Sequence, residues 1–512
     1  MTPSEVAAAL RQVRGVGDAE VLFAEPKPGE KKVIAYVVPD TATIETLLAE
    51  TEEEHKQLRK WRKTFDLMQF GKEASAAPMA FNIAGWNSSY TRQPIPPEEM
   101  REWVEETVRS IKILRPQEVL EIGCGTGLLL LRIAPSCRRY VGTDFSPAVL
   151  KRVREQMSRL DKPLEGVTLL ERSADNFEGC IPGSFDTVIV NSVIQYFPGL
   201  TYLLLVLEKL VSLVKPGGRI FLGDLRSLPL LEVYALSVEL FQAPASMTLG
   251  ELRGRVRKRI QNQSELLLSP SFFLALQKRL PEISRVEVRP KRGRTDNELT
   301  RFRFNAVLSV GAENPAAIAP SWMDWPAAGL APAMIRQRLE DPKCTSLALR
   351  GVPNVRVESE LTALRAVGGG EGGMTVGKLR SALQESKTSG VHPTVLFALA
   401  EESGFSLDWS CLNSRSDGAF DLLFDRKSTS GAPPFVSWPM PAQVSAELTE
   451  HCSNPRRSKL GEALIQALTS FSVENLPQAV RPAEFVLVES LPATFRGQID
   501  LGAHAVPGTV QS

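Results

Sequence analysis

The sequence predicts an α/β fold in which helices cover both faces of a mostly parallel sheet. Between residues 118 and 310, near-continuous apolar segments alternate with helical patterns, as is typical of parallel strands buried on both faces. A glycine-rich turn at 123–127 joins the first of these strands directly to a helix. A helical excursion at roughly 228–280 precedes the last two strands, which indicates an antiparallel edge.

The elements of this sheet follow one another at regular spacing. A helix from Glu98 to about Leu114 comes first, since the prolines at 94–97 are tolerated in a first helical turn. The expected strands cover residues 118–122, 139–143, 167–171, 185–191, 218–223, 284–290 and 302–310. The expected helices between them cover residues 127–134, 147–160 and 200–214.

The segments outside the sheet predict smaller parts. Residues 1–40 predict a short α/β piece in which Ser4 caps a helix through Arg14. Residues 312–332, rich in Ala and Pro, indicate a linker, and the glycine run 368–373 indicates a flexible connector. The remaining expected elements are strands at 19–23, 32–38, 406–411, 419–425, 484–490 and 498–501 and helices at 43–68, 375–386, 392–403 and 457–471.

The composition excludes several classes of protein. With 512 residues, 43% hydrophobic and 23% charged, the chain is long enough for several domains of a globular protein. Sixty basic and 59 acidic residues leave no net field that would attract nucleic acid or a membrane surface. Six cysteines without CxxC spacing indicate reduced thiols, and the N-terminus lacks a secretory pattern, so a cytoplasmic location is expected.

The four histidines are also informative. None lies between Lys56 and Val391, the stretch that contains the glycine-rich turn. Activation of a nucleophile or binding of a metal by a histidine from that stretch is therefore excluded, and no metal site is expected.

Polar residues follow the expected strands at their carboxyl ends, where open α/β sheets bind ligands. The glycines of the turn allow a ligand to approach the backbone at a helix N-terminus, and Asp144, about 20 residues on, can bind ribose hydroxyls. Asp175 can accept the amino group of adenine while Phe177 packs on the purine. Asn191 and Asp224 end the next two strands. A nicotinamide-dependent oxidoreductase shares the turn, but it does not explain the Asp175 position.

These residues resemble those of class I S-adenosylmethionine-dependent methyltransferases, with Lys215–Gly218 as a further shared turn. Longer polar motifs resemble, more narrowly, the N-methyltransferase domain embedded in non-ribosomal peptide synthetases. They are Asn82–Tyr90, Asn191–Pro198, Gly223–Leu228 and Asn297–Arg303. This narrower resemblance implies a Rossmann-like seven-stranded core, S-adenosylmethionine as cofactor, and N-methylation of the α-amine of an aminoacyl thioester on a carrier protein.

The flanks resemble the two halves of the small C-terminal subdomain of an adenylation domain, which such a methyltransferase interrupts. The resemblance implies partnership with an adenylation core or other synthetase modules. Where that family carries a catalytic lysine, this sequence has Gln498. The expected parts are residues 1–40 (first half of the subdomain), 41–98 (helical lid), 99–312 (methyltransferase core), 313–430 (α+β accessory region) and 431–512 (second half).

The resemblance and the strand-end pattern together assign the candidate site residues. The predicted cofactor-binding residues are Tyr90, Glu121, Gly123, Gly125, Gly127, Asp144, Phe145, Ser146, Asp175, Asn176, Phe177 and Asn191. Those predicted to orient the amine are Glu298, Asp224, Tyr196 and Asn191, and those predicted to contact substrate are Trp86, Asn87, Gln195 and Arg226. The segment around Trp86 and Tyr90 is expected to close over the cofactor and exclude water.

Other interpretations of these residues stay open. Asp224 can pair with Arg226, Glu298 can pair with Arg301 or Arg303, and Tyr196 can serve as a wall of the core. The lid segment can be a surface loop held by its aromatic residues. The same fold can methylate an oxygen or a carbon of the tethered substrate, or serve as an inactive docking module.

Overall fold

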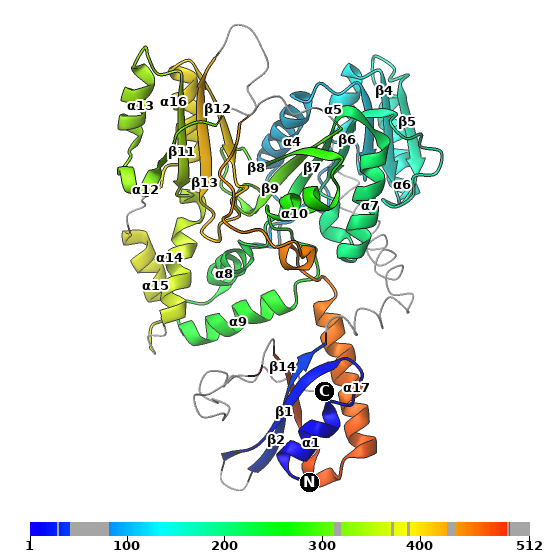
Figure 1. Ribbon diagram of the computed structural model, residues 1–512, viewed down its shortest axis with the longest axis vertical. Coiled ribbons are helices and arrows are strands. Elements are labelled where there is room, and N and C mark those ends of the chain that lie inside the picture. Colours follow the sequence, from blue (N-terminus) through cyan, green and yellow to red (C-terminus); the bar gives the residue numbers. More distant parts are fainter. Residues whose placement is uncertain are drawn as a thin grey trace. The chain divides into compact units, whose positions relative to one another are not determined.

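Figure 1 shows the computed structural model, which describes residues 1–27, 30–40, 81–311, 319–369, 373–386, 390–427, 436–488 and 491. Two compact units are present. The smaller unit combines both ends of the chain, Met1–Arg59 and Pro455–Ser512, with the short stretch Gln261–Ser264. The larger unit comprises Lys60–Ile260 and Glu265–Asn454. The expected helix at 43–68, the strand at 498–501 and Gln498 lie outside the described residues.

The larger unit is built on a seven-stranded sheet with the order β5-β4-β3-β6-β7-β9-β8. The first five strands in this order are parallel, while β9 is antiparallel to both β7 and β8. This confirms the fold class and the antiparallel edge predicted from the sequence. The strands are β3 (Glu118–Ile122), β4 (Arg139–Asp144), β5 (Val167–Glu171), β6 (Phe185–Asn191), β7 (Val214–Arg226), β8 (Ile283–Pro290) and β9 (Arg303–Val310).

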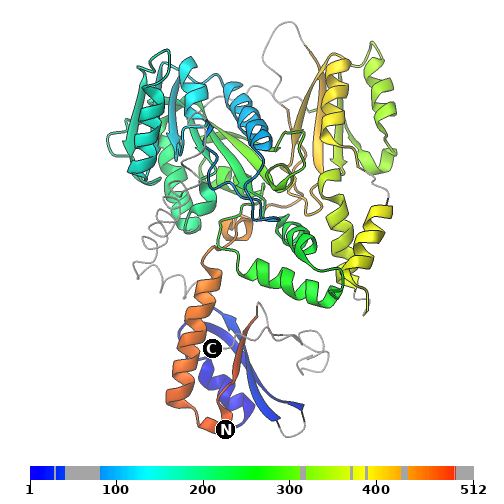
Figure 2. The ribbon, with the colours of Figure 1, turned by 180° about the vertical axis from the view of Figure 1, so that it is seen from behind.

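Helices cover the sheet on both faces, as the buried apolar strands require. Figures 1 and 2 show one set of helices on each face. On one face, apolar side chains of α4 (Pro97–Lys112), α5 (Leu130–Ile133) and α6 (Pro147–Met157) share a core with the strands. On the other lie α7 (Leu200–Leu213) and α10 (Phe272–Arg279).

Local signals explain where these helices begin. Ser146 caps α6 by accepting a hydrogen bond from Val149 N at 3.3 Å, and Pro147 occupies the first turn. Helix α4 starts at Pro97 with acidic residues in its first turn and basic residues in its last, as the helix dipole favours. The expected helix at 127–134 is shorter in the structure, because Gly127 has φ +80° and the helix begins only at Leu130.

An insertion of helices follows β7, as predicted for roughly 228–280. It consists of α8 (Leu231–Gln242), α9 (Leu249–Gln261) and α10. A short helix, α11 (Glu298–Arg301), precedes β9 and is capped by Asn297, whose side chain accepts hydrogen bonds from two backbone N–H groups. Both α8 of this insertion and the separate helix α11 matter for the site, because Ser237 and Glu298 on them bind the segment at 81–90.

The accessory region holds a second sheet, with the order β10-β11-β13-β12. Parts of the expected linker at 312–332 are instead ordered elements, because Trp325 is buried and anchors them in the core of this region. Residue 369, expected in a connector, ends a helix. The elements are β10 (Trp322–Asp324), α12 (Trp325–Ala328), α13 (Pro332–Glu340), β11 (Ser346–Val352), α14 (Val355–Gly369), α15 (Val376–Glu385), α16 (Pro393–Glu402), β12 (Phe405–Ser410) and β13 (Phe420–Arg426).

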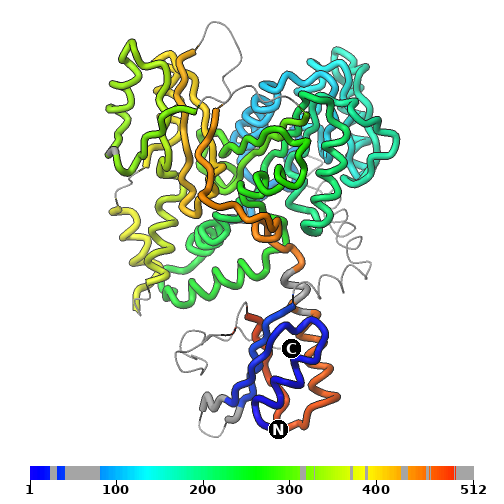
Figure 3. The backbone as a smooth tube through the Cα atoms, in the orientation of Figure 1, coloured from blue at the N-terminus to red at the C-terminus, as the bar shows by residue number. Residues whose placement is uncertain are grey.

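The two ends of the chain form the smaller unit together (Figure 3). Strand β14 pairs in parallel with β2, which is antiparallel to β1. Thr2 caps the first helix, rather than Ser4 as predicted, because its side chain accepts from Glu5 N. The elements are α1 (Pro3–Leu10), β1 (Val16–Lys27), β2 (Glu30–Pro39), α17 (Arg457–Asn475) and β14 (Glu484–Leu487).

Candidate active site

The carboxyl ends of the parallel strands form one continuous edge, which we call the rim. Backbone hydrogen bonds join neighbouring positions along it. Cys124 N donates to Thr143 O at 2.8 Å, and Arg172 N donates to Asp144 O at 2.9 Å. On the other side, Ser192 N donates to Gly223 O at 3.1 Å. The structure therefore brings the ends of β3 to β7 together, as the strand order requires.

The glycine-rich turn has the geometry of a ligand-binding loop. Gly123, Gly125 and Gly127 have φ of +68°, +52° and +80°, which disfavour other residues. A Cβ at Gly123 would lie 2.5 Å from a methyl carbon of Val193, so this glycine is required by packing. A Cβ at Gly125 would meet no atom within 4 Å. The backbone at Gly125 therefore borders open space that a cofactor can enter.

Asp144 ends β4 beside this turn. Its carboxylate accepts hydrogen bonds from Gly125 N at 3.0 Å and from Ser146 N at 2.9 Å, and the side chain is buried. These bonds fix the carboxylate at the rim, and a carboxylate has lone pairs for more than two donors. Phe145 is half-buried next to it. The pair can therefore bind ribose hydroxyls and contact an adenine ring.

Glu121 lies in β3 and is buried behind the turn. Tyr140 Oη donates to its Oε2 at 2.8 Å. Burial, together with the charge of Asp144, raises the pKa of Glu121 from 4.5 to about 7. A carboxyl group that is partly protonated at pH 7 therefore lies in β3, two residues before Gly123.

We expect the pH dependence of stability to change when Glu121 is replaced by glutamine. Between pH 4.5 and 7 the folded protein holds a proton on Glu121 that the unfolded chain has released. Stability therefore falls as pH rises through this window, by about 1–3 kcal/mol for this group. Urea unfolding at pH 5 to 8, followed by tryptophan fluorescence, checks this, since the six tryptophans among the described residues belong to the larger unit. Parallel pH profiles for Glu121→Gln and the unaltered chain would contradict it.

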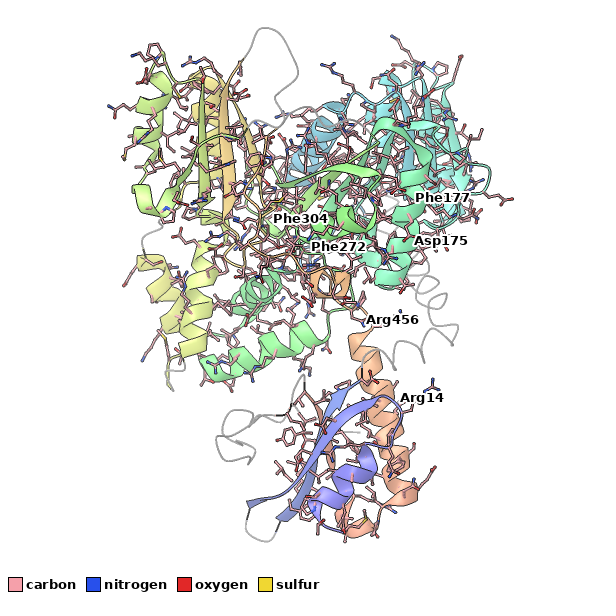
Figure 4. The ribbon with its side chains drawn as sticks, in the orientation of Figure 1. Arg14, Asp175, Phe177, Phe272, Phe304 and Arg456 are labelled. Atoms are coloured by element: carbon pink, nitrogen blue, oxygen red, sulfur yellow. The ribbon has the colours of Figure 1, made fainter. Side chains whose placement is uncertain are left out.

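Asp175, Asn176 and Phe177 follow β5. In the sheet, β5 and β6 lie on opposite sides of β3, the strand that leads into the glycine-rich turn. Tyr202 Oη, in the first turn of α7, donates to Asp175 Oδ1 at 3.0 Å. Figure 4 shows Asp175 and Phe177 in this position, and Phe177 is half-buried. Asn176 is exposed and its Oδ1 accepts from Glu178 N at 3.0 Å. Asp175 Oδ2 and the ring of Phe177 can meet an adenine base.

Asn191, Ser192 and Asp224 form a polar cluster at the ends of β6 and β7. Ser192 Oγ donates to Asp224 Oδ2 at 2.7 Å, and Asn191 Nδ2 donates to Ser192 Oγ at 3.2 Å. Asn191 is buried and its Oδ1 has no hydrogen-bond partner within the described chain. An unpaired buried acceptor at the rim is the kind of group that a ligand satisfies.

The Asp224 carboxylate is fully buried and surrounded by donors. Trp103 Nε1 donates to it at 3.0 Å, Arg303 Nη1 forms an ion pair with it, and Lys291 Nζ lies 3.7 Å away. Burial alone would raise the pKa of Asp224, but Arg303 and Lys291 hold it below its ordinary value. Asp224 is therefore an ionised anchor within the site, with no exposed face to offer a substrate.

The segment at 81–90 lies against the glycine turn and the start of the sheet core. Thr126 Oγ1 donates to Asn82 O at 3.0 Å, and Trp86 packs at 4.7 Å from Trp103. Glu298 binds this segment from α11, accepting from Ser89 N at 2.7 Å and from Ser89 Oγ at 2.9 Å. The segment is thus attached at both ends to elements of the rim. Whether it closes over a bound cofactor stays a prediction.

Several predicted site residues are engaged elsewhere. Tyr90 Oη lies 2.8 Å from Ser237 Oγ of α8, and burial raises the pKa of Tyr90 to about 12. Arg226 forms an ion pair with Glu265. Asn87 is exposed and its backbone bridges to Pro94.

The ion-pair partners of Asp224 and Arg301 also differ from those expected from the sequence. Asp224 pairs with Arg303 rather than Arg226, and Arg301 pairs with Glu360 rather than Glu298. Gln195 is buried with its Oε1 unpartnered among the described residues. Burial raises the pKa of Tyr196 to about 12.

Sequence reasoning missed residues that the fold brings to the rim. They are Asn82, Trp103, Thr126, Ser192 and Lys291. Ser192 carried a signal, since it directly follows an apolar strand. Trp103 and Lys291 carried none, because their partner Asp224 is remote in the sequence.

The residues present fit the cofactor that the sequence motifs imply. The open space at Gly125, the fixed carboxylate of Asp144 and the unpaired Asn191 Oδ1 lie along one rim. In the described part of the chain, no group of three or more His, Cys, Asp or Glu side chains is arranged to hold a metal ion. Among the same residues, no helix has the length and apolar character that crossing a bilayer needs.

Several known proteins are similar to this chain. A family profile described as a methyltransferase domain matches residues 120–220. Chondramide synthase from Chondromyces crocatus is 36% identical over 98% of this chain, which spans 13% of that protein. Cyclosporin synthetase from Tolypocladium inflatum is 28% identical over 97% of the chain, which spans 3% of it. The N-methyltransferase NodS from Bradyrhizobium japonicum WM9, solved with S-adenosyl-L-homocysteine, covers 44% of this chain and 99% of its own, at 16% identity and a TM-score of 0.25.

The strand order, the rim and the matching profile define a class I S-adenosylmethionine-dependent methyltransferase with a Rossmann-like core. Its cofactor is S-adenosylmethionine. More narrowly, the chain is a methyltransferase of the type embedded in non-ribosomal peptide synthetases, as its polar motifs and its similarity to synthetase segments indicate. The chain spans less than a fifth of the length of either synthetase.

Proposed function

We propose that this methyltransferase N-methylates the α-amine of an aminoacyl thioester carried on the phosphopantetheine arm of a carrier protein. The proposal is supported by the similarity to synthetase segments and by the polar motifs at 82–90, 191–198 and 297–303. An adenylation core or other synthetase modules would be its partners. The smaller unit, made of both chain ends, would be the split adenylation subdomain.

The chemistry of the rim residues favours an amine rather than an alcohol as the methyl acceptor. The polar groups at the carboxyl ends of β6 and β7 are hydrogen-bond acceptors rather than strong bases. Asp224 is held ionised by Arg303 and Lys291, and the pKa of Tyr196 is about 12, so neither is suited to taking a proton near pH 7. The α-amine of an aminoacyl thioester has a pKa of no more than about 8, so a sizeable fraction is already neutral. An alcohol would need stronger activation.

Bound S-adenosylmethionine supplies an electrophilic methyl group on a sulfonium. The turn glycines, Glu121 and Asn191 would hold it, with Tyr90 from the 81–90 segment. Its ribose and adenine would be held by Asp144, Phe145, Ser146, Asp175, Asn176 and Phe177. Because transfer is an in-line displacement, the protein's contribution is mainly positioning.

Some residues predicted to orient the amine would act on it indirectly, through the groups to which they are hydrogen-bonded. Asn191 can act on the amine through Ser192, to which its Nδ2 donates, and Tyr196 can pack beside the substrate. Asp224 acts through the groups bonded to it, and Glu298 acts by holding Ser89. Trp86 and Gln195 would contact the remainder of the substrate. Asn87 and Arg226 stay candidates for its more distant parts.

The proposal is tested by incubating an aminoacyl-loaded carrier protein with methyl-labelled S-adenosylmethionine and analysing the product by mass spectrometry. We expect a gain of one methyl group, located on the α-nitrogen by fragmentation. A carrier loaded with the matching N-acetylated amino acid is the control and should gain none. Labelling of a side-chain oxygen or of a carbon would contradict N-methylation and leave the class of enzyme intact.

A further inference from the structure

Two non-glycine residues at the rim have left-handed backbone. Ser192 has φ +57° and directly follows β6, while Asp224 has φ +62° and lies in the adjacent strand β7. Such conformations cost on the order of 1–3 kcal/mol each and persist where the surroundings enforce them, which is common at functional sites. The two strained residues are hydrogen-bonded to each other. Two strained residues that bind each other at the rim indicate a functional role for the pair.

The hydroxyl of Ser192 is held in one orientation. Its O–H donates to Asp224 Oδ2, and one of its lone pairs accepts from Asn191 Nδ2. A serine oxygen has two lone pairs, so one acceptor position is left. Ser192 is half-buried, unlike Asp224, so this position is accessible from the rim.

Asp224 cannot easily turn away from Ser192. Trp103 and Arg303 bind its two oxygens, and its own backbone N–H donates to Asn305 Oδ1 at 3.0 Å. An anion fixed in this way holds the O–H bond of Ser192 in one direction. Because the hydroxyl donates to a negative charge, its Oγ becomes a stronger hydrogen-bond acceptor.

Other predicted amine-orienting groups are less available. Both oxygens of Glu298 accept from Ser89. Asn191 Oδ1 lies close to Gly223, where an added Cβ would meet it at 2.1 Å, so it points toward the neighbouring strand. Within the cluster of Asn191, Ser192 and Asp224, Ser192 is the residue that is not fully buried.

We propose that Ser192 is a catalytic residue whose Oγ accepts a hydrogen bond from the N–H of the acceptor amine, with Asp224 as the positioning residue behind it. The inference rests on the proposed function. The nitrogen lone pair forms the new N–CH₃ bond while the electrons of the S–CH₃ bond move to sulfur. The resulting ammonium loses its proton to water, so no protein base is required. Ser192 fixes the direction of the nitrogen lone pair during this displacement.

The test is Ser192→Gly, because glycine adopts this backbone angle without strain and the variant therefore folds. We expect kcat to fall about 10- to 100-fold, the loss of one oriented hydrogen bond in the transition state. The dissociation constant for S-adenosylmethionine should stay unchanged, and the melting temperature should not fall, because glycine relieves the backbone strain at this position. A purely structural role would instead lower the melting temperature or weaken cofactor binding. Ser414→Gly is the matched control, since Ser414 also has left-handed backbone (φ +56°) and a bonded hydroxyl, and its kcat should equal that of the unaltered chain.

The outcomes separate the two proposals. Equal kcat for Ser192→Gly and the unaltered chain overturns the role of Ser192. A fall in kcat that is matched by Ser414→Gly, or accompanied by weaker cofactor binding, overturns it as well. If the unaltered chain transfers no methyl group to an aminoacyl thioester but still binds S-adenosylmethionine, the proposed function fails.

Discussion

Replacing Asp224 by alanine is expected to lower the free energy of unfolding of the larger unit by about 3–5 kcal/mol, because a buried charge pair would lose one partner. Arg303 and Lys291 would remain buried without their anion, and Trp103 Nε1 would lose its acceptor. Urea unfolding followed by tryptophan fluorescence measures this, and alanine would also be strained at φ +62°.

Two further variants separate the causes. Asp224→Asn removes the charge but tolerates the left-handed backbone, so it isolates the electrostatic part. Asp324→Ala is the matched control, since Asp324 pairs with Arg350 at the surface, and its loss of stability should be much smaller than that of Asp224→Ala. Because Asp224 has a lowered pKa, its contribution is present above its ordinary pKa near 4 and declines as pH falls through the lowered value. A loss below 1 kcal/mol for Asp224→Ala would contradict this account.

Replacing Gly125 by alanine is expected to weaken S-adenosylmethionine binding by at least about 100-fold, roughly 3 kcal/mol. The added Cβ would enter the space at the turn without touching the protein. Stability should therefore fall only by the cost of left-handed alanine, about 1–2 kcal/mol. Isothermal titration of each variant with S-adenosylmethionine, together with its unfolding curve, measures both quantities.

Two other glycines make this prediction specific. Gly123→Ala should instead lose stability, because its Cβ would collide with Val193. Gly404→Ala is the matched control, with φ +75° and no neighbour within 4 Å, but in the accessory region. It should lose the same stability as Gly125→Ala and bind cofactor normally. Equal cofactor affinity in Gly125→Ala and Gly404→Ala would show that the cofactor does not approach the turn.

The sequence was sufficient for the central sheet and for part of the rim. Strands such as Phe185–Asn191 carry a continuous apolar run (Val188–Val190), and the glycine turn and Asp144 lie at fixed distances in the sequence. These signals are local in the sequence, so they can be recognised before the fold is known. The role of each rim residue toward cofactor and substrate stays a prediction.

Contacts between distant segments could not be predicted in this way. The pairing of Asp224 with Arg226 was a reasonable expectation, because residues two apart in a strand share a face. The register of β7 with β9 shifts between Leu222 and Leu225, and this irregularity turns Asp224 toward Arg303. Strand β11 was not predicted, because no element was assigned between the linker at 312–332 and the glycine run at 368–373.

The most direct test of this account is a crystal structure of the chain with S-adenosyl-L-homocysteine, the spent form of the cofactor. The account predicts the ribose hydroxyls at hydrogen-bond distance from Asp144, the adenine beside Asp175 and Phe177, and the sulfur facing Asn191 and Ser192. A ligand bound away from Asp144, or a rim that stays closed at Gly125 in the presence of saturating ligand, would contradict it.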